Sequence, residues 1–396
     1  MTSHRIETVA QRFAVKGRLV AVQPVPGGNV NDTHLAVFRT TFSEERIILQ
    51  RINVRVFKRP AWIMSNLRQV TDHVHRRLHV EAAGEDRIWQ LPRIVPTRDG
   101  RDWVSDGKGG FWRALTLIAS AVSYDKAQGP EHAFEAGTVL GQFHRLLSDL
   151  SPGRLRDTLP GFHVTPLYLE RYDETRATAP AKRRLAASVE AARLARFVED
   201  RREFAGVLEA ARERGELKPR LIHGDPKVNN VLVDQLTGKG TCIVDLDTVK
   251  PGLIHYDFGD ALRSIANPAG EEEIDLAKVF FDTTLCEAFV RGYNSRARDF
   301  LTAADRRYLY DSIRLITFEL GLRFFEDYLA GDRYFKVRSE GHNLHRARVQ
   351  FKLCESIEAR EPDIRRILDN LTSAAGSASP RKNGRRAEAR RRRAAR

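Results

Sequence analysis

The chain has few cysteines and no long apolar run, and each shortage excludes a class of protein. Cys242, Cys286 and Cys354 are widely spaced and odd in number, so they form neither a zinc-binding pattern nor a disulfide framework and indicate a reducing, cytoplasmic location. No run of about 18 apolar residues occurs, so no membrane-spanning helix is expected. The N-terminal Met-Thr-Ser-His-Arg leads into no apolar signal core. Internal repeats are also lacking.

Length and charge indicate a two-lobed protein with a separate basic end. A chain of 396 residues is too long for one compact core, so two lobes are expected. The net charge of +14 suggests nucleic acid, but residues 381–396 hold nine Lys or Arg and one Glu, which leaves +6 for the rest. We interpret residues 372–396 as a disordered basic tail in solvent. Weak RNA or membrane association is the alternative, and no specific nucleic-acid or membrane partner is expected.

The first hundred or so residues have the pattern of strands around one helix. Short apolar strands are predicted at 18–25, 35–38 and 45–52, the first two joined by the polar turn 26–33. A helix is predicted over 62–80, because apolar residues recur there every three or four positions. Two further strands are expected, one around Trp103 and one at 111–118.

After Ser120 the pattern becomes mostly helical. Helices are predicted over about 136–150, 273–292, 303–329 and 343–370, and a long charged helix or helix pair over 181–214. Two short strands, 231–233 and 242–244, flank the turn 237–240 and predict a hairpin. The expected fold class is therefore α+β, with a small β-rich lobe at 1–118 and a larger, mostly helical lobe at 119–371.

The strongest motif is Leu221-Ile-His-Gly-Asp-Pro-Lys-Val-Asn-Asn230, followed by Ile243-Val-Asp-Leu-Asp247. It places an amide, Asn230, five residues after Asp225, and a second carboxylate, Asp245, fifteen residues later. This order is typical of phosphoryl transfer: Asp225 accepts the proton of a substrate hydroxyl, while Asn230 and Asp245 hold the Mg²⁺ that neutralises the phosphates of ATP. His223 is expected to brace this loop.

Two features of the small lobe point to nucleotide phosphates. The turn Gly27-Gly-Asn-Val-Asn-Asp-Thr33 offers backbone N–H groups, and its candidate cofactor-binding residues are Gly28, Asn29, Asn31 and Thr33. The third strand lacks a Lys that would pair with phosphate. Arg51 is the only cation in its interior, with Gln50 beside it; either side chain could face the nucleotide, and we favour Arg51.

Three further signals have competing interpretations. Tyr256-Asp-Phe-Gly-Asp260 spells a kinase metal motif but follows no apolar strand, so Asp257 is expected to accept hydrogen bonds from the catalytic loop instead. Lys227 either stabilises charge on the transferred phosphoryl group or is a solvated surface residue. Arg323 and Tyr334, taken alone, indicate packing and surface charge at a helix end.

Together these residues resemble the aminoglycoside phosphotransferase-like kinases, which have a protein-kinase-like fold, and most closely the N-acetylhexosamine 1-kinases. The resemblance runs from about residue 20 to about 360. It is carried by Gly28–Thr33, Ile48–Asn53, Asn229–Leu232, Val244–Val249, Tyr256–Asp260 and the block Arg323–Phe335. His223-Gly-Asp225 departs from this group, which often has His-Asn-Asp.

The resemblance implies ATP- and Mg²⁺-dependent phosphorylation of the anomeric hydroxyl of N-acetylglucosamine or N-acetylgalactosamine. It implies that Asp225 is catalytic and that Arg323, Tyr334 and His163 contact the sugar, which reverses the unaided interpretation of Arg323 and Tyr334. Two alternatives stay open. One is a related phosphotransferase acting on an aminoglycoside, choline or N-acetylmuramate, and the other is an inactive kinase-like nucleotide-binding module.

Overall fold

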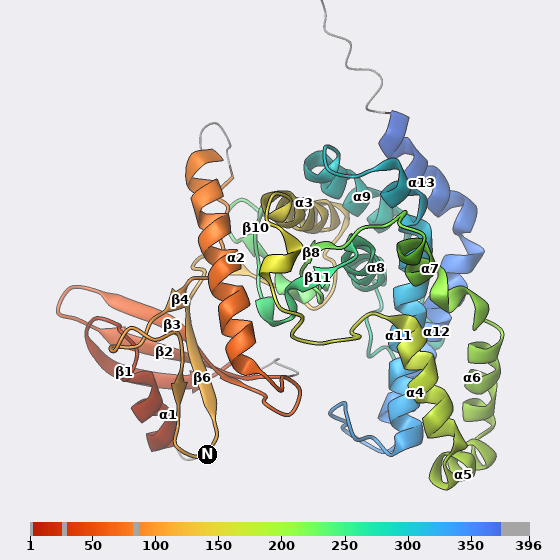
Figure 1. The fold of residues 1–396 in the computed structure, drawn as a ribbon, viewed down its shortest axis with the longest axis horizontal. Coiled ribbons are helices and arrows are strands. Elements are labelled where there is room, and N and C mark those ends of the chain that lie inside the picture. Colours follow the sequence, from red (N-terminus) through yellow and green to blue (C-terminus); the bar gives the residue numbers. More distant parts are fainter. Residues whose placement is uncertain (1–2, 26–29, 82–86, 374–396) are drawn as a thin grey trace, which may run out of the picture.

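The chain forms a small lobe built on an antiparallel sheet and a larger helical lobe (Figure 1), in a computed structural model that describes residues 3–25, 30–81 and 87–373. We call the part up to Thr116 the small lobe and the part from Ile118 the large lobe. The small lobe comprises α1 (Ser3–Ala10), β1 (Arg18–Pro24), β2 (Asp32–Arg39), β3 (Glu44–Ile52), α2 (Pro60–Glu81), β4 (Ile94–Val95), β5 (Val104–Ser105) and β6 (Phe111–Thr116). The expected α+β organisation is therefore confirmed.

The sheet has the order β1-β2-β3-β6-β4, with β5 also paired to β6. Side chains alternate between its two faces. Ile47 and Leu49 of β3 pack with Trp112 of β6 and with Phe13 behind α1 in a small core of their own. The intervening residues of β3, including Gln50, therefore point to the opposite face.

Helix α2 joins the two lobes through its apolar stripe. Its residues Ile63, Leu67, Val70 and Val74 are buried in the same core as Phe143 of α3. Figure 1 shows α2 standing between the sheet and the large lobe. The main core of the protein thus extends from the large lobe onto this helix.

The large lobe is a set of helices packed around two short β elements. Its strands are β7 (Ala121–Val122), β8 (Arg220–Ile222), β9 (Val231–Asp234), β10 (Gly240–Ile243) and β11 (Lys250–Gly252); β9 pairs with β10 and β7, and β8 pairs with β11. Its α-helices are α3 (Pro130–Leu147), α4 (Thr165–Ala177), α5 (Ala179–Ala187), α6 (Val189–Glu199), α7 (Val207–Glu213), α8 (Ile254–Ile265), α9 (Thr283–Ala297), α10 (Ala303–Arg307), α11 (Leu309–Ala330), α12 (His342–Ala359) and α13 (Glu361–Ser373).

Four predicted helices differ from those observed, among them 303–329, which is two helices, α10 and α11, separated at Tyr308. The segment 181–214 holds α5, α6 and α7, because the Ser188 side chain accepts a hydrogen bond from Ala191 N–H and starts a new helix. The helix predicted from 273 begins only at Thr283, where Asp282 caps the N-terminus. The helix predicted over 343–370 is two helices, since Pro362 fits the first turn of α13 but not a helix interior.

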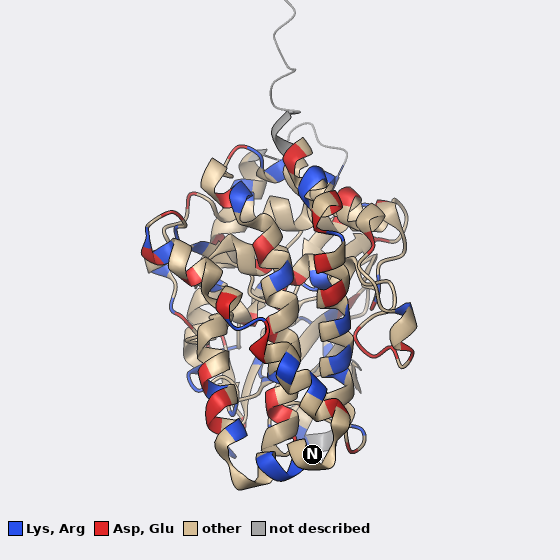
Figure 2. Ribbon diagram, turned by 90° about the vertical axis from the view of Figure 1, so that its right-hand side faces the viewer, with Lys and Arg blue, Asp and Glu red and all other residues tan. Residues whose placement is uncertain are grey.

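Charges of both signs are interspersed over the helices of the large lobe (Figure 2). Several form ion pairs between elements; Glu358 of α12, for example, pairs with Arg314 of α11 at 2.8 Å and with Arg201, in the turn after α6, at 2.7 Å. Such mixing differs from the single-sign surface that typifies nucleic-acid binding. Among the described residues, no helix combines the length and apolar character needed to cross a membrane.

Candidate active site

The catalytic loop, defined here as His223–Asn230, connects β8 to β9. Its last three residues form the short 3₁₀ helix η3 (Val228–Asn230). Its second residue, Gly224, has φ of 86°, and a Cβ there would lie 2.8 Å from the Thr248 carbonyl oxygen. Glycine meets both the positive φ and the close approach. The departure from His-Asn-Asp thus has a steric basis in this chain.

Asp257 of α8 anchors this loop through hydrogen bonds to its backbone. Its fully buried carboxylate accepts hydrogen bonds from the backbone N–H groups of His223, at 2.6 Å, and Gly224, at 2.7 Å. His144 Nε2 lies 2.8 Å from the same carboxylate. These are the loop contacts expected of Asp257.

The His223 ring braces the loop from inside. Its Nε2 lies 2.9 Å from the Val244 carbonyl oxygen, while Nδ1 accepts a hydrogen bond from Asp225 N–H at 3.2 Å. Burial lowers the pKa of His223, which keeps the ring neutral and suits an Nδ1 acceptor. Both nitrogens are occupied within the protein.

Asp225 presents its carboxylate beside Lys227 and Asn230. Lys227 Nζ lies 2.5 Å from Asp225 Oδ2, and Asn230 Nδ2 donates to the Asp225 carbonyl at 2.7 Å and to Oδ2 at 3.3 Å. Burial acts to lower the pKa of Lys227, but the Asp225 and Asp245 carboxylates raise it above its ordinary value. Lys227 is therefore a fixed cation beside the Asp225 carboxylate.

Asp245 follows β10 and stands next to Asn230. The Val244 N–H donates to the Asn230 carbonyl at 2.9 Å, which brings the two segments together. Asp245 adopts a left-handed backbone with φ of 64°, a sparsely populated conformation for a residue other than glycine. Such strain recurs at functional sites.

The oxygens of Asp245 and Asn230 fit a hard cation. The Asp245 side chain reaches solvent, yet desolvation by surrounding protein, followed by the charges of Asp247 and Asp225, raises its pKa to about 7. A cation there would favour the ionised form. No group of three or more His, Cys, Asp or Glu suited to a metal occurs in the described ranges, so Mg²⁺ would take most ligands from phosphate and water.

On the small-lobe side, the structure gathers Asn31 and Thr33. Asn31 Nδ2 donates to Asp247 Oδ2 at 2.7 Å, and Thr33 Oγ1 accepts from Gln50 Nε2 at 3.2 Å. Gly28 and Asn29 lie outside the described residues. Of the predicted phosphate-facing set, Asn31 thus contacts the large lobe, and Thr33 contacts the neighbouring strand β3.

Arg51 lies apart from this group. It is paired in register with Trp112, on the face of the sheet that packs against α1, and its guanidinium is 3.9 Å from Asp32. Gln50 has the opposite orientation, and its Oε1 accepts hydrogen bonds from Arg113 of β6. The period-two alternation of β3 therefore brings Gln50 rather than Arg51 to the inner face.

The predicted acceptor residues Arg323 and Tyr334 lie around an aromatic cluster. The Arg323 guanidinium lies over the rings of Phe162, Tyr168 and Phe335, at 5.0, 5.2 and 5.6 Å from their centroids. Burial acts to lower its pKa, yet Tyr168, Glu319 and other neighbours raise it. Within the described ranges the contacts of this guanidinium are with these aromatic rings, and it forms no ion pair with a carboxylate.

Tyr334 is carried by a loop that Asp327 holds in place. The Asp327 carboxylate accepts hydrogen bonds from three consecutive backbone N–H groups, those of residues 333–335, and from Asn343 Nδ2. The Tyr334 side chain itself is largely exposed, and its ring meets that of Phe335 edge-on at 4.8 Å. The loop is rigid at its base while this ring faces solvent.

His163 is placed as a brace between the catalytic loop and α11. Its Nδ1 lies 3.0 Å from Glu319 Oε1 and its Nε2 2.8 Å from the Gly224 carbonyl oxygen. Burial acts to lower the pKa of His163, but the charge of Glu319 raises it. Neither ring nitrogen is left for a substrate hydroxyl, and the adjacent Phe162 ring connects this brace to Arg323.

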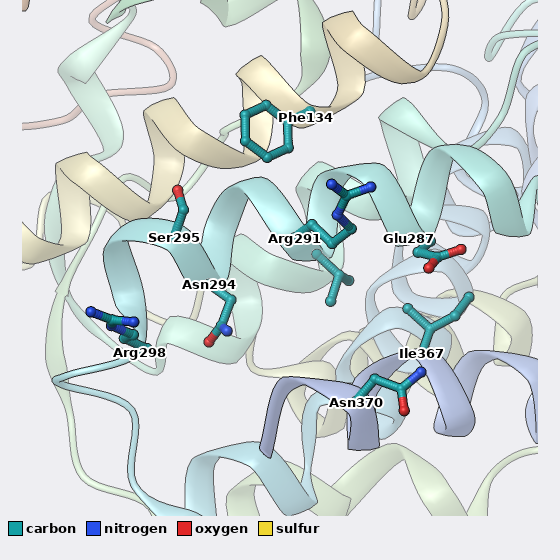
Figure 3. Close-up of a pocket in the computed structure, with 9 residues that line it drawn as sticks. Phe134, Glu287, Arg291, Asn294, Ser295, Arg298, Ile367 and Asn370 are labelled. Carbon is teal, nitrogen blue, oxygen red and sulfur yellow. The ribbon is translucent and has the colours of Figure 1, made fainter. Parts of the chain in front are cut away.

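A separate recess of about 330 Å³ lies between α3, α9 and α13 (Figure 3). Figure 3 shows Glu287, Arg291 and Asn294 of α9 and Arg298, just after it, on one side of this recess, with Ile367 and Asn370 of α13 opposite. None of the predicted site residues lines it.

Sequence reasoning missed Arg113, Asp247, Asp327 and Glu319. Each is a buried charged residue, and two carried a readable signal. Arg113 is the lone charge in the apolar run 111–118, and Asp247 repeats the acid of Asp245 two residues on. A charge that is buried must be paired, so such positions point to a partner.

The sequence pattern described as "Phosphotransferase enzyme family" matches residues 22–301. Among solved structures, a microcompartment-associated aminopropanol kinase is 18% identical with a TM-score of 0.58, over 92% of this chain and 99% of that one. Choline kinase from Cryptosporidium parvum Iowa II is 12% identical with a TM-score of 0.60, over 94% and 99%.

A spectinomycin phosphotransferase, solved in complex with ADP and spectinomycin, is 13% identical with a TM-score of 0.50, over 94% of this chain and 98% of that one. At these identities the likenesses establish the fold: a kinase-like arrangement of two lobes, as the sequence predicted.

Proposed function

Because the chain belongs to the phosphotransferase enzyme family, we propose that it transfers the γ-phosphoryl group of ATP to the anomeric hydroxyl of an N-acetylhexosamine, giving the sugar 1-phosphate. The observation that supports this proposal is an unbroken series of contacts between the Asp225 end of the site and the Arg323 end. Asp225 lies beside Lys227 and Asn230 at one end. The loop then connects through His163 to the Arg323 cluster at the other.

In this proposal Asp225 orients the acceptor hydroxyl and takes its proton late, because the transition state is loose and requires little basicity. An anomeric hydroxyl is more acidic than other sugar hydroxyls, so a carboxylate suffices as base. Lys227, held 2.5 Å from Asp225 Oδ2, stabilises negative charge on the transferred group. Asn230 and Asp245 would hold Mg²⁺, which supplies charge neutralisation on the phosphates.

The charge of the acceptor end favours a neutral, hydroxyl-rich substrate. Arg323 remains cationic and lies against three aromatic rings. A guanidinium donates to hydroxyl and carbonyl oxygens, while aromatic faces pack against the apolar face of a sugar ring. The same guanidinium would repel an ammonium group. This argues for an N-acetylated sugar over choline or an aminoglycoside.

The test is a panel of acceptors with purified protein, ATP and Mg²⁺: N-acetylglucosamine, N-acetylgalactosamine, N-acetylmuramate, choline and an aminoglycoside. We expect ADP release with the first two and a product whose phosphorus couples to the anomeric proton in NMR. A 6-phosphate, or turnover confined to choline or the aminoglycoside, would overturn the acceptor assignment. Nucleotide binding without turnover on any acceptor would favour a binding module.

Asp225→Asn tests the mechanism within the same assay. It keeps the shape but removes the proton acceptor, so kcat should fall about 10²-fold or more. Asp299→Asn, at a highly exposed carboxylate beyond α9, is the matched control and should keep full activity. Equal activity of the two variants would contradict the assigned role of Asp225.

A further inference from the structure

Arg113 is a buried cation at the meeting point of the two lobes. Its side chain is 1% exposed, although it belongs to the otherwise apolar strand β6. Its Nη2 lies 2.5 Å from Asp247 Oδ1, and its Nε and Nη2 donate to Gln50 Oε1 at 3.0 and 2.7 Å. Its Nη1 is buried without a partner among the described residues. A guanidinium in this setting is stable only with such partners.

Two chains of contacts run from Arg113 to the start of β2, one ending at Thr33 and the other at Asn31. One passes through Gln50, whose Nε2 donates to Thr33 Oγ1 at 3.2 Å. The other passes through Asp247, whose Oδ2 accepts from Asn31 Nδ2 at 2.7 Å. Asn31 Oδ1 in turn accepts from Asn53 N–H at 3.0 Å. Asn31 and Thr33 are therefore both linked to this cation through a single intervening side chain.

The second chain also crosses from the small lobe to the large one. Asp247 is 2% exposed and lies in the 3₁₀ helix η4 (Leu246–Thr248), two residues after Asp245. Its carbonyl oxygen accepts from Thr158 Oγ1 at 3.1 Å, which ties it to the large lobe. Asp247 thus joins Asn31, Arg113 of the sheet and the segment of the proposed metal ligand.

We propose that Arg113 is a positioning residue for the nucleotide: through Asp247 and Gln50 it sets Asn31, Thr33 and the Asp245 segment in register, so that all three meet the same phosphates. It supplies a buried cation from β6 beside Gln50, where β3 has none; Arg46, on the same face of β3, is largely exposed and pairs with Glu44. This role depends on the proposed function only in that the site binds ATP. It does not depend on which acceptor is phosphorylated.

The pair must be neutralised together, because removing one partner leaves a buried, unpaired charge and endangers folding. In the double variant Arg113→Met with Asp247→Asn, no charge remains, and the new amide keeps an oxygen that can accept from Asn31. Arg113→Lys restores the cation without the forked donors that reach Gln50 and Asp247 at once. The matched control is Arg348→Met with Glu190→Gln, which removes an ion pair of 3.1 Å between α12 and α6 of the large lobe.

The experiment measures the Kd of ADP by calorimetry, with and without Mg²⁺, and the melting temperature of each variant without ligand. We expect the double variant to melt close to wild type yet to bind ADP with Mg²⁺ at least tenfold more weakly, with Arg113→Lys intermediate and the control pair unchanged. For any acceptor that turns over, its KM should change less than that of ATP.

Several results would overturn the proposal. A double variant that binds ADP as wild type does, with or without a lower melting temperature, would make Arg113 a purely structural residue. A tenfold weakening in the control pair as well would show a general loss of rigidity. Wild-type protein that binds no nucleotide would overturn both this proposal and the proposed function, whereas a wrong acceptor would leave the ADP result standing.

Discussion

Asp257→Asn separates two interpretations of the Tyr256-Asp-Phe-Gly-Asp260 motif. In the structure the Asp257 carboxylate accepts from two backbone N–H groups of the catalytic loop, at 2.6 and 2.7 Å, and faces His144 Nε2 at 2.8 Å. A metal ligand would instead direct its oxygens to the nucleotide. The substitution keeps size and shape but replaces one acceptor oxygen with a donor NH₂.

The expected cost follows from these contacts. One of the two backbone hydrogen bonds to a charged acceptor is lost, which costs roughly 1.5–3 kcal/mol. The freed N–H is then buried opposite another donor, which adds about 1–3 kcal/mol. We expect a total near 3–5 kcal/mol, in line with removing one partner of a buried charged contact, and a melting temperature lower by about 5–15 °C.

The assay is thermal unfolding of wild type and variant, followed by the Mg²⁺ dependence of the initial rate at a temperature where both are folded. We expect a lower melting temperature and lower kcat, because the catalytic loop loses its support, with the apparent Mg²⁺ affinity nearly unchanged. The exposed Asp299→Asn should change stability by less than about 0.5 kcal/mol. An unchanged melting temperature together with weakened Mg²⁺ dependence would refute the reasoning and make Asp257 a metal ligand.

Three further predictions concern the metal, the acceptor and pH. Asp245→Asn should lower kcat by roughly 10²-fold at fixed Mg²⁺ while the fold survives, since an amide is a poorer ligand for a hard cation; normal turnover at saturating Mg²⁺ would place the metal elsewhere. Arg323→Met should raise the acceptor KM about ten- to a hundredfold, the equivalent of a charge-assisted hydrogen bond, with the KM of ATP little changed; earlier melting alone would indicate a packing role. Glu319 raises the folded-state pKa of His163. The ion pair between them therefore stabilises the folded protein fully below about pH 6.5, and this stabilisation is lost as pH rises through the folded-state pKa of His163. The difference in melting temperature between wild type and Glu319→Gln should therefore be larger at pH 6 than at pH 9, and a constant difference would disprove the coupling.

Local sequence determined the elements of the fold and the order of the catalytic groups. Period-two and period-3.6 patterns located β3, α2 and α11, because each pattern reflects one buried face. The spacing from Asp225 to Asn230 is local, and the structure forms it with a hydrogen bond between the two side chains. Helix ends were less predictable, since caps such as Asp282 are short-range choices among several polar residues.

Only the tertiary structure decided which charges share a partner. Arg113 and Asp247 are far apart in the sequence, and no local pattern links them, yet their pairing brings Asp247 of the large lobe against the sheet, where it also accepts a hydrogen bond from Asn31. His163 likewise meets Gly224 and Glu319 only because α11 packs against the catalytic loop. The sequence shows which residues can carry a charge. Burying that charge is unfavourable unless an oppositely charged or hydrogen-bonding partner lies nearby, and only the tertiary structure determines which residue that partner is.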